Sequence, residues 1–293
     1  MSIKVSNKEG LEFLKSIKSN TVDLILTDPP YITSQDSGMD RWVKHVEKQN
    51  KSGSVNAKTE EDWSRYVFLE SKFSKDWSKF FENSNIVDKN KACKRMKEDY
   101  LKYGSIYGEK YAVQTDFGAW DAQFTLDKLR AFVSEFYRVL KQGGTAIIFF
   151  DLWKISDLKN MYDSNDFKQV RFIEWIKTNP QPRNSNINYL TNCREIALSA
   201  VKVSKPTFNS TYDNGIYNYP FYSKKDRFHP TQKSLPLFEE LILKHSNEGD
   251  LVLDPFLGSG TTAIASKATN RSFIGCEIDA TFFEKSVERI EKS

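Results

Sequence analysis

Short apolar runs of strand length alternate with amphipathic segments over most of the chain. The run Val22-Asp23-Leu24-Ile25-Leu26 shows the pattern well, because its length and branched side chains are typical of a buried strand. Runs of this kind predict strands at 3–6, 22–27, 145–151, 170–176, 195–203, 250–254 and 272–276. Helical patterns predict helices near 9–18, from 125 through 140, from 261 to about 267 and over 281–290. Strands that alternate with helices predict an α/β fold.

Glycine, asparagine and proline residues, which favour helix ends and turns, refine the predicted element boundaries. The helix through Leu140 is followed by Lys141-Gln142-Gly143-Gly144, a pattern that predicts a glycine C-cap before the next strand. Residues 204–228 are rich in Gly, Asn and Pro and predict a loop in which basic and aromatic side chains alternate. Such a mixture suits contacts to phosphates together with base stacking, although ordinary packed loops share it.

The α/β pattern is interrupted between residues 34 and 118. This stretch is rich in lysine and in aromatic residues at helical spacing, which predicts a mostly helical insertion. The core domain is then formed by 1–33 together with 119–293. A solvated helical cap and a DNA-contacting or target-recognition element are both open roles for the insertion.

Composition narrows the class of protein without identifying it. Of the 293 residues, 28% are charged and 14% are aromatic, which is typical of a globular protein rather than a disordered one. No apolar run reaches the ~20 residues that cross a bilayer, and the first residues lack a signal-peptide pattern, so we expect a cytoplasmic protein. Three distant cysteines, Cys93, Cys193 and Cys276, argue against a zinc site or a disulfide framework. The formal charge of +4 permits a polyanionic partner without requiring one.

The first candidate for chemistry is Thr27-Asp28-Pro29-Pro30-Tyr31, which directly follows a predicted strand. Prolines fix the backbone and donate no N–H, so the carbonyls around them can serve as fixed acceptors. A carboxylate, two such carbonyls and an aromatic ring suit the binding of a planar ring that carries an amine. Taken alone, the stretch is better explained as a proline-rich turn with a capping Asp.

The second candidate is the run Asp254-Pro255-Phe256-Leu257-Gly258-Ser259-Gly260, again after a predicted strand. Glycines allow close approach of a ligand, and the following helix offers free N–H groups at its N-terminus. The next strand ends in Glu277, where a carboxylate can accept both hydroxyls of a ribose. Strand, glycine turn, helix, strand and acid in this order favour a nucleoside-cofactor site over a structural βαβ unit.

The position of the second candidate indicates a permuted sheet. Only about 15 residues follow Glu277, so the remaining strands must come from the N-terminal half. Ligands of such sheets bind at the carboxyl ends of the strands. The Asp28 turn and the Gly258 turn are therefore expected on one edge of the sheet.

Together the two motifs resemble those of DNA amino-methyltransferases that use S-adenosyl-L-methionine, in the permuted order of their β group. The segment Asp28–Tyr31 is similar to the family's catalytic D-P-P-Y motif, and Asp254–Thr262 is similar to its D-P-F-x-G-S-G-T-T loop. Further matches are Phe136–Gly144, Glu174–Pro180, Arg194–Leu198 and His229–Lys233, the last resembling H-P-T-Q-K-P. The resemblance covers roughly two thirds of the chain. It implies a Rossmann-like seven-stranded methyltransferase sheet, circularly permuted, with a mostly helical insertion.

The resemblance also implies roles for individual residues. In the catalytic tetrapeptide, the Asp28 carboxylate and the Pro29 carbonyl accept the hydrogens of a base amine, Pro30 completes the rigid turn, and Tyr31 stacks on a base flipped out of the duplex. Glu9 stands where the family has an Asp near the adenine of the cofactor. No metal is required. The residues expected around the cofactor are Glu9, Thr231, Lys233, Asp254, Pro255, Phe256, Gly258, Ser259, Gly260, Thr261, Thr262 and Glu277.

DNA contacts are assigned to two groups of residues. Lys177 and Asn179 follow a predicted strand and are candidates on the substrate side, with a salt-bridged lysine as the alternative. Lys224, Lys225 and Arg227 lie in the basic and aromatic loop. Double-stranded DNA is the expected partner, in a protein of bacterial or phage origin. A cognate restriction endonuclease and a homodimer are further candidate partners.

The target base and two rival functions remain to be separated. Asp as the first residue of the tetrapeptide is typical of N6-adenine enzymes in this family, whereas N4-cytosine enzymes usually carry Ser, so adenine is expected. A nicotinamide-dependent dehydrogenase would use Gly258-x-Gly260-x-x-Ala263 but leaves the Asp28 turn unexplained. A non-catalytic DNA-binding protein would bind DNA without methylating it.

Overall fold

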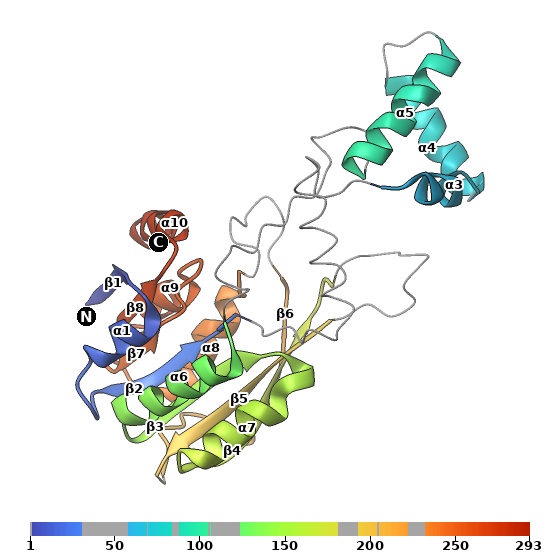
Figure 1. Cartoon of the computed structure of the whole chain (residues 1–293). Helices are drawn as coiled ribbons and strands as arrows, with labels where there is room; N and C mark the ends of the chain where they lie inside the picture. Colours follow the sequence, from blue (N-terminus) through green and yellow to red (C-terminus); the bar gives the residue numbers. More distant parts are fainter. Residues whose placement is uncertain are drawn as a thin grey trace. The chain divides into compact units, whose positions relative to one another are not determined.

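A computed structural model describes residues 2–30, 58–68, 70–83, 88–104, 106, 124–180, 193–203, 205–221 and 232–293 (Figure 1). The chain divides into two compact units, one formed by Met1–Ile32 with Phe117–Ser293 and the other by Thr33–Asp116. Five residues of the predicted site lie outside the described residues: Tyr31, Lys224, Lys225, Arg227 and Thr231.

The larger unit is built on one eight-stranded sheet. The strand order is β1-β8-β7-β2-β3-β5-β4-β6, and every neighbouring pair is parallel except the two pairs that involve β5. Because β5 runs against the others, its first residues lie at the edge where the other strands end. The bounds are β1 Ile3–Asn7, β2 Val22–Thr27, β3 Leu140–Phe150, β4 Phe167–Lys177, β5 Arg194–Lys202, β6 Ile216–Tyr219, β7 Leu251–Asp254 and β8 Ser272–Glu277.

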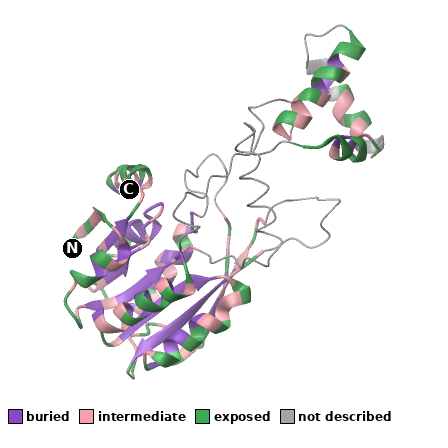
Figure 2. Ribbon diagram, in the orientation of Figure 1, coloured by how far each residue is buried: buried purple, intermediate pink, exposed green. Residues whose placement is uncertain are grey.

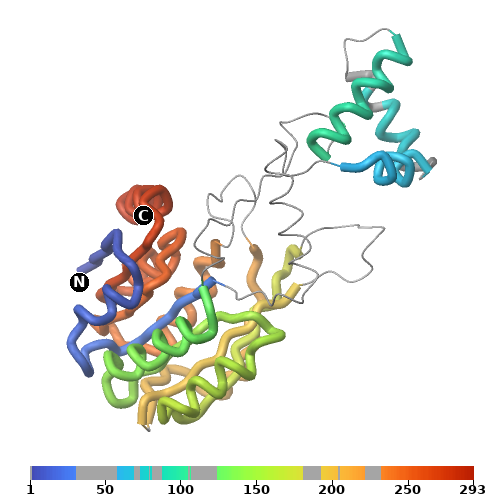
Figure 3. The backbone as a smooth tube through the Cα atoms, in the orientation of Figure 1, coloured from blue at the N-terminus to red at the C-terminus, as the bar shows by residue number. Residues whose placement is uncertain are grey.

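Helices cover both faces of this sheet, and the strands are buried between them (Figures 1 and 2). One face packs against α1 Gly10–Lys15, α6 Leu126–Val139 and α7 Ile155–Ser164, the last preceded by the 3₁₀ turn Leu152–Lys154. The other face packs against α8 Leu235–His245, α9 Thr261–Ala268 and α10 Ala280–Glu291. In Figure 3 the two ends of the unit's chain, blue and red, follow neighbouring strands, which reflects the pairing of β1 with β8.

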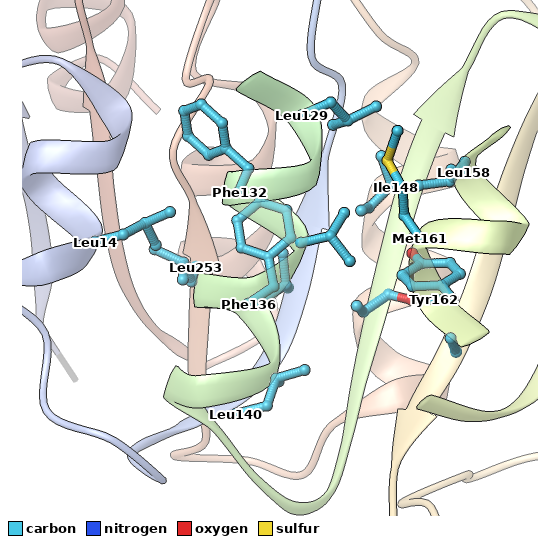
Figure 4. Packing of buried hydrophobic residues seen from close by; sticks show 14 of the residues in the cluster. Leu14, Leu129, Phe132, Phe136, Leu140, Ile148, Leu158, Met161, Tyr162 and Leu253 are labelled. Carbon is cyan, nitrogen blue, oxygen red and sulfur yellow. Dashed lines mark hydrogen bonds between the residues drawn. The ribbon is translucent and has the colours of Figure 1, made fainter. Parts of the chain in front are cut away.

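The core on the first face is formed mainly by large side chains of α6 that point to the sheet (Figure 4). Phe132 and Phe136 are fully buried and lie one helical turn apart, as the 3.6-residue period requires. They pack with Leu14 of α1 and Leu253 of β7, so residues from both ends of the chain share one core. Burial of apolar side chains therefore joins the first and last parts of the chain in one core.

The α/β class, the permuted order and the strands read from the apolar runs agree with this structure, and two details differ. Helix α6 ends at Val139 with Leu140 as its C-cap, and the glycines that predicted a C-cap lie inside β3. The last carbonyls of α6 accept hydrogen bonds from the Asn20 and Thr21 amides, so no left-handed glycine is needed there. Gly143, at a φ of +80°, instead lies in the irregular part of β3, where the pairing with β2 shifts register between the Val22–Leu140 pair and the Leu24–Thr145 pair.

The second difference is the strand count. The sheet has eight strands where seven were expected, because Ile216–Tyr219 adds a parallel edge strand, β6, beside β4. This strand lies inside the segment 204–228, for which the sequence predicts a loop. An edge strand pairs on one side alone and is short, so its sequence carries only a weak strand pattern.

In the smaller unit, the described residues form three helices, which agrees with the predicted helical content. They are α3 Glu60–Phe68, α4 Glu70–Asn83 and α5 Lys89–Tyr103. Their aromatic residues pack on each other, with the rings of Tyr66 and Tyr100 stacked at a centroid distance of 4.9 Å. Asp88 caps α5 at its start and Gly104 ends it in the left-handed conformation. Across the described parts of both units, no helix is long and apolar enough to span a membrane.

Candidate active site

Five strands bring polar side chains to one edge of the larger unit's sheet. These are the carboxyl ends of β2, β7, β8 and β4, together with the amino end of the reversed strand β5. The residues at those positions are Thr27 and Asp28, Asp254, Glu277, Lys177 and Glu195. The edge expected from the sequence is therefore the one on which the candidate residues meet.

Asp28 follows β2 directly and is held in a largely buried position. Its Oδ2 lies 2.9 Å from the Lys233 ammonium, while its Oδ1 is shielded from solvent and has no hydrogen-bond partner among the described residues. Burial raises the pKa of the Asp28 carboxyl to about 7, although Lys233 acts to lower it. The next residue, Pro29, is buried and has no N–H that could fill the vacant position. Among the residues that the structure describes, Asp28 thus offers one acceptor oxygen without a partner.

Lys233 connects Asp28 to a second carboxylate. Its ammonium also donates to Glu195 Oε2, and the other oxygen of Glu195 lies 2.6 Å from the Lys177 ammonium. Burial acts to raise the pKa of Glu195, but the two lysines together bring it below its ordinary value. The four side chains form a row of alternating charge along the sheet edge. Lys177 therefore forms the salt bridge that was the alternative to a DNA contact.

Asp254, at the end of β7, ties the two candidate turns together. It accepts hydrogen bonds from the hydroxyls of Thr27 and Thr262, each at 2.6 Å, and from the Phe256 amide at 3.0 Å. Burial raises the pKa of Asp254, and these donors partly offset that effect. Because Thr27 precedes Asp28 and Thr262 lies in the first turn of α9, the Asp254 carboxylate fixes the catalytic candidate relative to the glycine loop.

The glycine loop after β7 has the conformation that a nucleoside cofactor site needs. Gly258 and Gly260 have φ values of +51° and +77°, a region that side chains with a Cβ rarely adopt. The Glu277 carboxylate is buried at the end of β8 and accepts from the Gly258 amide at 2.8 Å and from the Asp279 amide at 3.0 Å. Burial raises the pKa of this carboxyl. A carboxylate beside a glycine turn and a helix N-terminus fits the ribose and amino-acid part of S-adenosyl-L-methionine.

The remaining loop residues shape the site from within. The hydroxyls of Ser259 and Thr261 lie 3.0 Å apart in the interior, and Arg289 of α10 donates to the Ser259 carbonyl at 2.8 Å. Pro255 is buried, and the ring of Phe256 packs at 4.6 Å from that of Phe132. These side chains hold the loop in place, so any contact they make to a cofactor comes from the main chain or from the exposed part of Phe256.

Glu9 and Asn179 have structural partners at the positions that the sequence assigned to ligands. Glu9 caps α1 by accepting from the Glu12 amide at 3.0 Å and pairs with Lys128 at 3.1 Å. Burial acts to raise the pKa of Glu9, but these two contacts bring it below its ordinary value. Asn179 uses both ends of its amide on the main chain of Phe221, which ties the loop after β4 to the segment after β6.

Two residues of this cluster have no role that the sequence motifs predict. Thr27 is the last residue before the Asp28 turn, and Glu195 lies in a strand that resembles the family. Glu195 did carry a signal, since it is a charged residue that opens an apolar run. That signal could be interpreted only once the reversed direction of β5 placed Glu195 at the site.

Comparison with known proteins gives a consistent result. Residues 22–288 match the family model described as DNA methylase. The type II methyltransferase M2.DpnII of Streptococcus pneumoniae is 32% identical over 198 residues, which cover 61% of this chain and 74% of that enzyme. M.HpaI of Haemophilus parainfluenzae is 32% identical over 227 residues, which cover 69% and 71%. M2.MboI of Moraxella bovis is 28% identical over 293 residues, which cover 95% and 84%.

Solved structures share the fold. The M1.HpyAVI complex with SAM is 24% identical with a TM-score of 0.57, and the alignment covers 98% of this chain and 99% of that one. The PvuII DNA methyltransferase, which is cytosine-N4-specific, is 13% identical with a TM-score of 0.60 and a coverage of 100% and 91%. At these identities the likeness concerns the arrangement of the sheet and helices.

Proposed function

We propose, from the premise that this chain belongs to the DNA methylase family, that it transfers a methyl group from S-adenosyl-L-methionine to the N6 amine of adenine in double-stranded DNA. The observation that carries the proposal is the Asp28 carboxylate. One of its oxygens is held by Lys233, and the other is buried with no partner among the described residues, at the strand end where the family has its catalytic motif. A base amine brought to this site would supply the missing hydrogen bond.

The residues of the chain are proposed to orient the base amine and to stabilise the charge that develops on it during methyl transfer. The lone pair of an exocyclic amine is delocalised into the ring, so acceptors on its two hydrogens favour the tetrahedral nitrogen that attacks. Asp28 Oδ1 and the Pro29 carbonyl are those acceptors, and Tyr31 is proposed to stack on the flipped base. The cofactor supplies an electrophilic methyl group on sulfur. As the C–N bond forms and the C–S bond breaks, the sulfur keeps the bonding pair, and the proton leaves the nitrogen for the Asp28 carboxylate.

The cofactor is assigned to the glycine loop. Gly258 and Gly260 allow close approach, and Glu277 is placed to accept from ribose hydroxyls with the lone pairs that its two backbone bonds leave. Asp254 acts from behind, by holding Thr27 and Thr262. Thr231 is proposed for this pocket on the resemblance to the family alone.

A direct assay tests the reaction. The protein is incubated with cofactor labelled in the methyl group and with DNA, the DNA is digested to nucleosides, and the methylated base is identified. We expect N6-methyladenine. Labelled N4-methylcytosine would move the enzyme to the cytosine class, and DNA binding without label would indicate a non-catalytic protein.

A variant assigns the reaction to Asp28. Asp28→Ala is expected to abolish methyl transfer while cofactor affinity stays within a few-fold, since Asp28 contacts the amine and not the glycine loop. The matched control is Asp163→Ala, because Asp163 forms an exposed pair with Lys159 on α7 and should be dispensable. Methyl transfer that survives in Asp28→Ala would refute the mechanism.

Contacts to DNA are proposed for the basic and aromatic loop. Replacing Lys224, Lys225 and Arg227 with Ala should weaken DNA affinity and reduce the dependence of affinity on salt, because each phosphate contact releases counterions. An unchanged salt slope would instead place the DNA contact in the helical insertion. The names of the type II relatives support a restriction endonuclease that shares the recognition site. A homodimer stays a prediction, which sedimentation can test.

A further inference from the structure

The Lys233 ammonium lies between two carboxylates that come from distant parts of the chain. It is 2.9 Å from Asp28 Oδ2 after β2, and it donates to Glu195 Oε2 at the start of β5. The Lys233 side chain is only 7% exposed, and its ammonium lies 5.2 Å from the centre of the Phe149 ring. A buried cation between two acids, with an aromatic ring beside it, is held in one geometry.

Glu195 is itself shared between two cations. Its Oε1 lies 2.6 Å from the Lys177 ammonium, which is flanked by the rings of Trp175 and Phe221, each at 5.3 Å. Glu195 therefore pairs with both lysines. Its negative charge opposes the effect of Lys233 on Asp28, because Lys233 acts to lower the pKa of Asp28 and Glu195 acts to raise it.

We propose that Lys233 and Glu195 are positioning residues for the Asp28 carboxylate. Lys233 holds Oδ2, so that Oδ1 is left for the amine, and Glu195 sets how strongly Lys233 acts on Asp28. This inference rests on the proposed function. It gives Lys233 a role on the catalytic side of the site, in place of the cofactor contact that the sequence suggested, and it gives a role to Glu195, for which the sequence motifs predict none.

The charged groups that face Asp28 make the inference testable. Among the described residues these groups are Lys233, Glu195 and Asp254, with Lys177 acting through Glu195. Lys233 favours the ionised carboxylate, whereas Glu195 and Asp254 oppose it and burial raises its pKa. Removing the Lys233 charge must therefore raise the pKa of Asp28. Removing the Glu195 charge must lower it, because repulsion is lost and Lys233 is left with one carboxylate.

The experiment measures kcat/KM for methyl transfer against pH in the full-length protein. The ionised Asp28 carboxylate is the stronger hydrogen-bond acceptor and the form that can take the proton of the amine, so activity falls on the acid side of its pKa. In Lys233→Met the acid limb is expected to move to higher pH by about one unit or more, so activity near pH 7 should fall at least about fivefold and recover as pH rises. In Glu195→Gln the limb is expected to move the opposite way, to lower pH.

Three further measurements isolate the effect. The KM for S-adenosyl-L-methionine should stay within about threefold in both variants, and Lys233→Arg, which keeps the charge, should keep the limb near its wild-type position. The matched control is Lys141→Met. Lys141 pairs at 2.8 Å with Asp23 near the other end of β2 and is half exposed, so its loss should leave the pH profile unchanged. If Lys233→Met does not fold, the Glu195→Gln shift tests the inference by itself.

Two outcomes would overturn the inference. Variants that lose activity equally at all pH values would show that the row of charges only supports the fold. A large rise in the KM for the cofactor in Lys233→Met, with an unmoved acid limb, would return Lys233 to the cofactor pocket. Failure of the proposed function looks different, because the wild-type protein would then form no N6-methyladenine.

Discussion

The hydroxyl of Thr27 is expected to stabilise the fold by an amount that can be estimated from its contact. It donates to Asp254 Oδ1 at 2.6 Å in the interior, where Thr27 is fully buried and Asp254 is 3% exposed. A hydrogen bond to a charged group contributes about 1.5–3 kcal/mol to stability. Thr27→Val keeps the shape of the side chain and removes the donor, so the free energy of unfolding should fall by about this amount.

The destabilisation by Thr27→Val should change with pH in a direction that follows from the pKa of Asp254. Burial raises the pKa of Asp254 in the folded protein above its ordinary value of 3.8, so the native state holds this proton more tightly than the unfolded chain does. Thr27 donates to the ionised form, and its loss raises the folded pKa further. The destabilisation by Thr27→Val should therefore be full where Asp254 is ionised and should shrink as pH falls toward about 4.

Urea unfolding at about pH 8 and about pH 4 measures both effects, provided that the slope with denaturant is unchanged. Thr145→Val is the matched control. The Thr145 hydroxyl is buried on the neighbouring strand β3 and has no hydrogen-bond partner among the described residues, so its loss should be neutral or slightly stabilising. Equal destabilisation by the two substitutions, or a loss in Thr27→Val that does not change with pH, would refute the reasoning.

Two further predictions concern the backbone and the smaller unit. Gly143→Ala should lower the free energy of unfolding by more than Gly249→Ala, as measured by urea midpoints. Both glycines have positive φ, but a Cβ at position 143 would lie 2.6 Å from the Lys205 carbonyl oxygen, whereas a Cβ at position 249 would meet nothing within 4 Å. The strain alone is worth about 1–2 kcal/mol, so equal effects would exclude the clash. Trp63→Ala should destabilise the helical unit by about 3–5 kcal/mol, seen as faster hydrogen exchange of α5 amides. Phe68→Ala, at an 85% exposed position, should leave that exchange unchanged.

The sequence by itself determined every strand of the sheet except β6, and the two turns that carry the chemistry. Val22–Thr27 and Ser272–Glu277 are apolar runs between turn signals, and the prolines and glycines that follow the strands restrict the backbone locally. The permuted order could be derived because a strand, a glycine turn and an acid came last in the chain. These features depend on neighbouring residues, which a sequence displays directly.

Only the tertiary structure decided which charges meet. Asp28, Glu195 and Lys233 come from segments far apart in the chain, and their contacts depend on the sheet register and on the reversed direction of β5. No local pattern encodes that register. The role of Gly143 also depends on tertiary contacts. Its sequence context predicts a helix end, but the Asn20 and Thr21 amides satisfy the last carbonyls of α6, and Gly143 lies in β3. Ion pairs and bulges of this kind are set by the packing of whole elements, because each needs partners that only the folded chain brings together.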